Sequence, residues 1–200
     1  MSRAPTVLAY HKPVGLVVTH ADEHGRETVY DRLVPRLPPA LRGRVWHACG
    51  RLDKDTSGLL LVTDDGAFVD HATQPRTALP KTYLVLARGL LDDAALEPIR
   101  RGLELTGGLG RSAPARATIL GHGVATTWLS VEVREGKNRE VRRLLLAIGS
   151  QVIRLQRVQI GGLALDLEPD EWRLLTPEEV RSKLGYPPAA PRRGPRARGG

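Results

Sequence analysis

Hydrophobic residues along this chain come mostly in runs of strand length, and only a few follow a helical period. The run 59–63 is almost continuously apolar, which is typical of a strand buried on both faces. The run 152–160 instead alternates in character from one residue to the next, as a strand with two different faces does. The segments expected to form strands are 7–10, 16–19, 59–63, 81–87, 115–120, 127–133, 152–160 and 172–175.

Helices are fewer, and their ends carry the usual signals. In 138–148, Val141, Leu144, Leu145 and Ile148 fall at i, i+3, i+4 and i+7, and a glycine follows, which predicts an amphipathic helix. Thr-Pro-Glu-Glu at 176–179 has the form of a capping box. The segments expected to form helices are 28–33, 67–72, 92–101, 138–148 and 177–184.

The balance of elements predicts the fold class. Strands outnumber helices, and the strands 115–120 and 127–133 read as a hairpin around Gly-His-Gly at 121–123. This favours an α+β fold with a mixed, largely antiparallel sheet flanked by helices. We expect residues 1–186 to form a single two-lobed domain. Residues 187–200 contain only Pro, Ala, Arg and Gly, and we expect a basic disordered tail there.

Charge narrows the class of partner. The chain of 200 residues carries a formal charge of +8, and four arginines in the tail supply half of it. A basic protein favours a polyanionic partner, without distinguishing RNA from DNA or from an acidic membrane. The single cysteine, Cys49, allows no internal disulfide, and no apolar run approaches the length of a membrane span. We therefore expect a cytoplasmic protein with no membrane association.

The first candidate for chemistry is the polar segment Gly50–Gly58, which lies between two apolar runs. It carries Arg51, the carboxylates Asp53 and Asp55, and two hydroxyl groups. Loops that project from a rigid sheet often hold catalytic groups. The same residues also fit a purely structural turn, in which Asp55 or a hydroxyl group accepts hydrogen bonds from nearby backbone amides.

Metal and thiol chemistry find less support. Asp53, Asp55, Ser57 and Asp64 have the spacing of a calcium loop, but such loops join two helices and here a strand should follow. The histidines lack zinc-ligand spacing. Cys49 lacks an orienting group that would activate a nucleophilic thiol. We expect no metal site.

The second candidate is a basic stretch. Between residues 134 and 157 the chain has seven basic and two acidic residues. Arg139, Arg142 and Arg143 are expected at i, i+3 and i+4 on the start of the helix 138–148, off its apolar stripe. Together with Arg154 and Arg157 they favour a phosphate-binding surface, although an ordinary solvated helix face fits the same pattern.

Four motifs in order make the chain similar to a known family. The run Gly-Arg-Leu-Asp-Lys-Asp-Thr-Ser-Gly-Leu-Leu-Leu at 50–61 resembles the signature of pseudouridine synthases of the RsuA/RluB/RluE/RluF type. Lys-Pro at 12–13, Lys-Thr-Tyr at 81–83 and the segment 135–143 match the family's other motifs, and 171–173 matches a closing element. The resemblance runs from about residue 10 to 175. It implies the pseudouridine synthase fold with a central catalytic cleft.

The resemblance also implies roles for single residues. Asp53 would be the catalytic aspartate, Tyr83 would pack against the target base, and Arg142 would pair with Asp53. Arg51 would enter the RNA and help to hold the target nucleotide out of its stack. The other residues expected to contact RNA are Lys12, Lys137, Arg139, Arg143 and Arg157. The product is an isomer of the substrate, so no cofactor is expected.

The motifs begin within the first dozen residues, which leaves no room before them for the small S4 module of many members. The chain is therefore more similar to the RluE-like branch, which favours large-subunit (23S) over small-subunit ribosomal RNA as the substrate. We expect a monomer. Two rival functions stay open: a non-catalytic RNA-binding or ribosome-assembly protein, and a carboxylate-dependent hydrolase with Asp55 as its second acid. The synthase requires Asp53 and Arg142 to share a cleft.

Overall fold

The computed structural model describes residues 5–187, except residues 75, 78, 106 and 109. Within this part of the chain, nine strands form one sheet in the order β5-β6-β4-β7-β3-β1-β9, with β2 paired to β3 and β8 to β7. The strands are β1 Val7–Lys12, β2 His47–Ala48, β3 Ser57–Thr63, β4 Lys81–Arg88, β5 Arg116–His122, β6 Thr126–Val133, β7 Val152–Ile160, β8 Leu163–Ala164 and β9 Trp172–Leu174. The helices are α1 Val29–Leu33, α2 Pro39–Arg42, α3 Gly66–Thr73, α4 Asp93–Arg101, α5 Glu140–Ala147 and α6 Pro177–Leu184, and a single 3-10 turn η1 covers Val34–Arg36.

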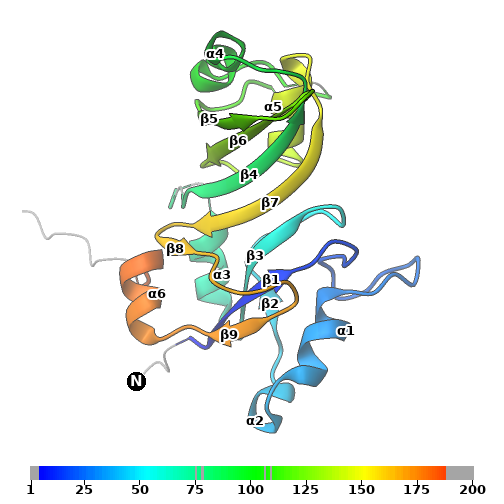
Figure 1. The fold of residues 1–200 in the computed structure, drawn as a ribbon. Helices are drawn as coiled ribbons and strands as arrows, with labels where there is room; N and C mark the ends of the chain where they lie inside the picture. The colour runs from blue at the N-terminus through cyan, green and yellow to red at the C-terminus, as the bar shows by residue number, and fades with distance from the viewer. Residues whose placement is uncertain (1–4, 75, 78, 106, 109, 188–200) are drawn as a thin grey trace, which may run out of the picture.

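The sheet is divided into two halves, and the strands of each half run in antiparallel pairs (Figure 1). One half contains β5, β6, β4 and β7, with the short β8 paired to β7, and the other contains β3, β1, β9 and β2. Only β3 and β7 pair in parallel. The α+β class with a mixed, mostly antiparallel sheet is therefore confirmed.

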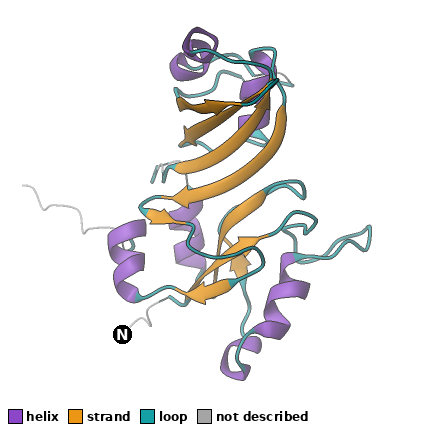
Figure 2. Cartoon of the chain, in the orientation of Figure 1, coloured by secondary structure: helices purple, strands orange, loops and turns teal. Residues whose placement is uncertain are grey.

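The half around β3 and β1 is covered on both faces (Figure 2). In β3, Leu59 and Leu61 pack into a core with α3 and α6, whereas Leu60 and Val62 pack into another with α1 and α2. All four side chains are fully buried. The sequence of β3 is continuously apolar because its alternate side chains enter two different cores.

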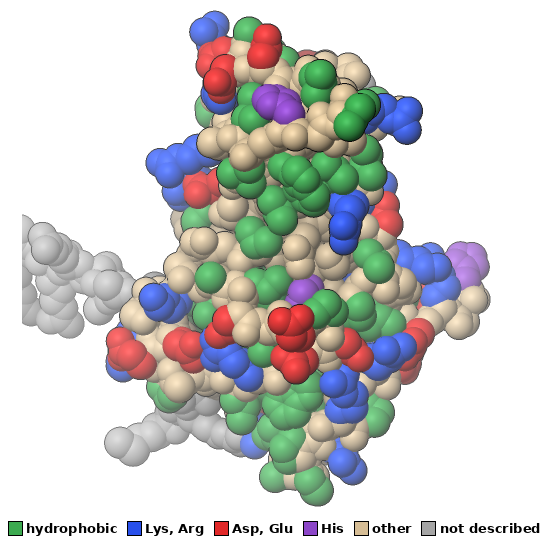
Figure 3. Space-filling model, viewed as in Figure 1, with side chains coloured by type: hydrophobic (Ala, Val, Ile, Leu, Met, Phe, Trp, Pro, Cys, Tyr) green, Lys and Arg blue, Asp and Glu red, His purple; other side chains and the backbone are tan. Residues whose placement is uncertain are grey.

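The other half has helices on one face only. Its core joins Val85 of β4, Leu129 of β6 and Leu155 of β7 to the apolar sides of α4 and α5. On the opposite face, hydrophobic side chains gather over the strands where no helix covers them (Figure 3). The alternation seen in the sequence of β7 follows from this one-sided burial.

The two halves meet at a short parallel contact that depends on a glycine. Ser57 pairs with Gln156 and Gly58 with Arg157. Gly58 has φ of +113°, and a Cβ there would lie 2.2 Å from the carbonyl oxygen of Arg157. Only glycine fits such a backbone approach. The glycine that ends the polar segment therefore joins the halves next to Asp53.

Most of the predicted elements are present, with two corrections. Residues 16–19 form no strand, because Val17 makes only an isolated bridge to Thr28. The helix expected from residue 138 begins at Glu140, and Arg139 precedes it in a left-handed conformation with φ of +51°. Arg139, Arg142 and Arg143 are therefore not three neighbours on one helix. The capping box at Thr176 is confirmed.

Pro98 lies inside α4. No helix in the described residues is long and apolar enough to cross a lipid bilayer. The tail expected to be disordered, apart from Pro187, lies outside the described residues.

Candidate active site

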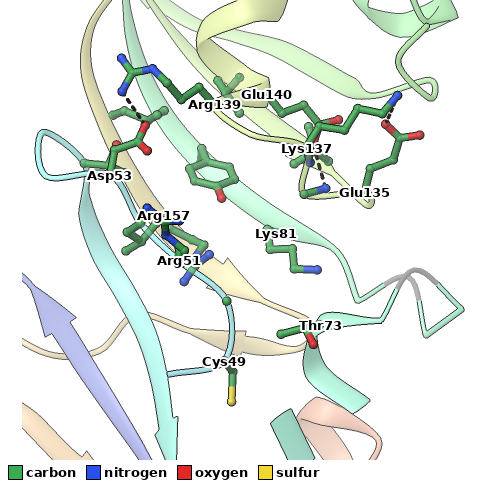
Figure 4. Close-up of a pocket in the computed structure, with 18 of the residues that line it drawn as sticks. Cys49, Arg51, Asp53, Thr73, Lys81, Glu135, Lys137, Arg139, Glu140 and Arg157 are labelled. Atoms are coloured by element: carbon green, nitrogen blue, oxygen red, sulfur yellow. Dashed lines mark hydrogen bonds and ion pairs between the residues drawn. The ribbon is translucent and has the colours of Figure 1, made fainter. Parts of the chain in front are cut away.

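A cavity of about 200 Å³ opens where the two halves of the sheet meet. Its walls come from the polar segment 50–56, from β4 and β7, and from the loop that leads into α5 (Figure 4). A wider hollow of about 850 Å³ lies on the other side of residues 51–55, toward the loop 14–26. Residues 51–53 and Arg139 line both spaces. The polar segment that starts at Gly50 therefore forms the wall between the two hollows.

Asp53 stands on a tight turn at the wall of the cavity. Its backbone carbonyl accepts a hydrogen bond from Thr56 N at 3.1 Å, which closes the turn just before β3. Its Oδ2 accepts a hydrogen bond from Arg139 Nη1 at 3.0 Å (Figure 4). The side chain is 28 % exposed. A carboxylate hydrogen-bonded to a guanidinium and open to the cavity is held in a fixed orientation.

Arg142 lies close to Asp53, but it is not among the residues that line the hollows, and its shortest ion pair is with Asp55. Its Nε is 3.7 Å from Asp53 Oδ2, whereas its Nη2 is 2.9 Å from Asp55 Oδ2. Nη2 also donates to the carbonyl oxygen of Asp55 and to Thr56 Oγ1, at 3.3 and 3.4 Å. Arg142 therefore ties the whole turn to α5, and Arg139 makes the shorter contact with Asp53.

Tyr83 forms one wall of the cavity from the middle of β4. It pairs with Val131 of β6 and with Arg157 of β7, and its ring packs against cores of both halves. Its hydroxyl is hydrogen-bonded to no residue that the structure describes. A half-buried ring held by the sheet is a rigid surface on which a planar base can stack.

Arg51 and Lys12, both expected to contact RNA, have opposite environments. Arg51 is exposed and lines both hollows and a third one next to His20 and His47. Lys12 is fully buried, and its ammonium donates to the carbonyl oxygens of Pro13 and Thr56 at 2.8 and 2.9 Å. Because these bonds occupy Lys12 inside the protein, it supports the turn of Asp53 from beneath.

Burial lowers the pKa of Lys12 to about 8, and the nearby charges of Asp55 and Asp53 act in the opposite direction. Desolvation of an ammonium in this way costs free energy that its two carbonyl partners only partly return.

The loop before α5 is held by a buried glutamate. Glu140, 5 % exposed, accepts hydrogen bonds from the backbone amides of Gly136 and Lys137 at 2.9 and 3.2 Å. Burial raises the pKa of Glu140, and these amides lower it. Lys137 donates to the carbonyl oxygen of Arg111 at 2.6 Å and pairs with Glu135. The loop is therefore fixed when it presents Arg139 to Asp53.

Two of the predicted arginines lie away from the surface expected for them. Arg143 donates to the carbonyl oxygen of Asn138 at 3.1 Å and lines none of the three hollows. Arg157 is only 3 % exposed and lies at the inner side of the cavity. The basic residues of 134–157 therefore do not form one surface. Arg139 lines two of the hollows and Arg157 lines the cavity, whereas Arg143 lines none of them.

Sequence reasoning missed Lys81 and Glu140 as residues of the site. Lys81 lines the cavity from the start of β4. Both residues stand in the segments quoted for the family resemblance, so the signal was present. Their contribution follows only from the way in which β4 and the loop before α5 are brought together.

The geometry of this segment supports neither a calcium loop nor a nucleophilic thiol. The polar segment connects two strands, β2 and β3, unlike a calcium loop between helices. Burial raises the pKa of the Cys49 thiol to about 12, so it stays protonated and a poor nucleophile. Among the described residues, no three His, Cys, Asp or Glu side chains gather where they could hold a metal ion.

Comparison with known proteins gives a consistent answer. Residues 6–147 match the family model described as RNA pseudouridylate synthase. The chain is 36 % identical over 182 residues to ribosomal large subunit pseudouridine synthase E of Vibrio vulnificus, which covers 84 % of this chain and 74 % of that relative. It is 44 % identical over 163 residues to ribosomal large subunit pseudouridine synthase B of Escherichia coli K12, covering 80 % of this chain and 52 % of that protein. The chain spans about half the length of the synthase B relatives.

Solved structures agree at the level of the fold. A crystal structure of a pseudouridylate synthase superposes with a TM-score of 0.79 at 32 % identity, over 90 % of this chain and 74 % of that one. The human protein RNA pseudouridylate synthase domain containing 1 has a TM-score of 0.57 at 16 % identity, over 92 % and 93 % of the two chains, and shares the fold. The chain belongs to the RNA pseudouridylate synthase family, which confirms the class of enzyme that its four motifs indicate.

Proposed function

We propose that this enzyme isomerises a specific uridine of large-subunit ribosomal RNA to pseudouridine, with Asp53 as its catalytic carboxylate. The observation that carries the proposal is the position of Asp53. It stands at the wall of a cavity, 3.0 Å from Arg139 and 3.7 Å from Arg142, across from the wall formed by Tyr83. The names of the similar proteins support ribosomal large-subunit RNA as the class of substrate.

The reaction moves one bond. The C1′–N1 bond of uridine breaks, and its electron pair stays with the uracil ring. Asp53 forms a bond to C1′ or stabilises the cationic sugar, as carboxylates do in glycoside chemistry. The free ring turns and C5 bonds to C1′, which releases the carboxylate of Asp53 if it had bonded there. The C5 proton is then lost while N1 gains one. Atoms balance without a cofactor.

Each neighbour has a role in these steps. Arg139 and Arg142 hold the carboxylate of Asp53 in position. Tyr83 provides the surface on which the ring stacks once it leaves the helix, and it stands where it can help to remove the C5 proton. Arg51, exposed where the hollows meet, enters the RNA in place of the extruded nucleotide.

The experiment maps pseudouridine in the ribosomal RNA of cells with and without the gene, complemented by wild type, Asp53→Ala or Asp55→Ala. We expect one site in large-subunit RNA to disappear and to return with wild type but not with Asp53→Ala. Asp55→Ala removes a carboxylate from the same turn and is the matched control. It should restore the site at a lower rate, since Arg142 loses its closest partner.

An unchanged map would contradict the proposal, and restoration by Asp53→Ala would favour a non-catalytic RNA-binding protein. Equal loss with both variants would mean that the isomerisation needs both carboxylates of the turn, and that Asp53 does not act as the single catalytic carboxylate.

A further inference from the structure

Arg157 is a buried cation with an unused donor. The side chain comes from β7, is 3 % exposed, and donates from Nε to the carbonyl oxygen of Leu59 at 2.7 Å. Its Nη2 is buried and has no hydrogen-bond partner among the described residues. Burying a donor of a charged group without a partner costs free energy. Arg157 also lines the cavity, so its guanidinium is available to a group that fills the cavity.

Lys81 adds a second cation to the same wall. It stands two residues before Tyr83 in β4, and Tyr83 is the cross-strand partner of Arg157. Lys81 therefore lies on the diagonal from Arg157, within reach for long side chains. No hydrogen bond or ion pair joins its ammonium to any residue that the structure describes. Burial, and then the charge of Arg157, lower the pKa of Lys81, while Glu140 raises it.

The carboxylates of the cavity are already engaged. Asp53 is paired with Arg139, Glu135 with Lys137, and Glu140 with backbone amides. Five basic residues line the cavity against these three acids: Arg51, Lys81, Lys137, Arg139 and Arg157. Lys81 and Arg157 have no ion pair with an acidic residue that the structure describes, and both lie on the wall formed by β4 and β7. The cavity thus has an acidic group held at the turn of Asp53 and free positive charge on the sheet.

The proposed reaction would place negative charge in this cavity. When the C1′–N1 bond breaks, the electron pair delocalises over the uracil ring onto its carbonyl oxygens. An extruded base enters a pocket more deeply than its phosphates, which stay on the strand. Donors buried on the cavity wall therefore meet the base. Donors fixed in advance at the place where charge develops are among the largest contributions to catalysis.

We propose that Arg157, assisted by Lys81, binds a carbonyl oxygen of the target uracil and stabilises the negative charge of the base while it is detached from the sugar. This rests on the proposed function and assigns the residues that receive the charge which leaves C1′. Arg157 then has two roles. Its Nε holds β7 to β3, and its guanidinium lines the cavity that receives the base.

The test compares single-turnover rates on an RNA fragment that carries the mapped uridine, and on the same fragment with 4-thiouridine at that position. A thiocarbonyl base leaves more readily and accepts hydrogen bonds more weakly, so it depends less on the proposed donors. On uridine, we expect Arg157→Met to lose about 10²- to 10³-fold in rate and Lys81→Met about tenfold. On 4-thiouridine both losses should shrink by about tenfold or to nothing.

Two controls separate chemistry from structure. Arg116→Met removes one exposed charge from β5, outside the cavity, and should leave both rates unchanged. Thermal unfolding shows whether Arg157→Met still folds. If it does not, Lys81→Met decides alone, because Lys81 makes no internal bond that its loss would break.

The outcomes are distinct. If wild type forms no pseudouridine in the RNA, the proposed function fails and this inference fails with it. If wild type reacts and the folded variants lose the same factor on both substrates, the function stands and the charge-stabilising role is wrong.

Discussion

Lys12 is a single residue whose environment sets a measurable pH dependence. Its ammonium is fully buried against two carbonyl oxygens beneath the turn of Asp53. Its pKa in the folded protein is about 8, below the ordinary 10.5. At neutral pH it is still charged, so the turn has a cation below it as well as arginines beside it.

The sign of the effect on stability follows from proton counts. Between about pH 8 and 10.5 the unfolded chain binds more protons at Lys12 than the folded chain does, so the free energy of unfolding rises with pH in this window. Below it the buried charge is a cost, and above it the cost is gone. Wild type should therefore gain up to roughly 3 kcal/mol relative to Lys12→Met across the window.

Chemical unfolding of both proteins at pH 7.5 and 10.5 measures this difference, and other titrating groups cancel in the comparison. A difference that stays flat or falls with pH would mean that the lysine is not buried as a cation.

At the scale of elements, the contact between β3 and β7 is the point on which the site depends. Gly58 lets the two backbones meet, and the same pair of strands carries the turn of Asp53 and the guanidinium of Arg157. A side chain at position 58 would need the strands to separate. The cavity would then lose the alignment between its two walls.

Gly58→Ala should therefore lower the free energy of unfolding by about 3 kcal/mol. Gly15→Ala is the matched control, because Gly15 has a similar φ of +103° but open space around its missing Cβ. It carries only the backbone strain, about 1 kcal/mol. Urea unfolding of the three proteins gives both values. Equal losses would show that the close approach to Arg157 contributes nothing.

At the scale of the whole molecule, Arg51 is an exposed cation at the place where the halves meet. Arg51 stands at the junction of three hollows and has no ion-pair partner among the described residues. An RNA strand that enters any of these hollows passes close to it. We expect Arg51→Met to weaken binding to large-subunit ribosomal RNA.

The same substitution should reduce the slope of log Kd against log salt concentration by about one. Filter binding at several salt concentrations measures the slope, with Arg116→Met as the variant that removes an equal charge elsewhere. If Arg116→Met reduces the slope as much, binding depends on net charge and not on the junction.

The sequence by itself determined the elements and the candidates. Apolar runs and capping signals are local, so β3, β7, the 115–133 hairpin and α6 could be read from neighbouring residues. The motifs containing Asp53, Tyr83 and Arg142 were recognisable for the same reason. The run 16–19 failed because its residues have strand propensity but no strand beside them, and pairing is decided by tertiary packing.

Only the tertiary structure decided how the charges are shared. Arg139 and Arg142 lie more than 80 residues from Asp53, and a left-handed turn at Arg139 brings it to the carboxylate while Arg142 bonds more closely to Asp55. No local pattern fixes that choice. Burial likewise separated Lys12 and Arg157 from the surface cations, because the packing of two sheet halves, and not residue type, determines which basic groups reach solvent and which face the cavity.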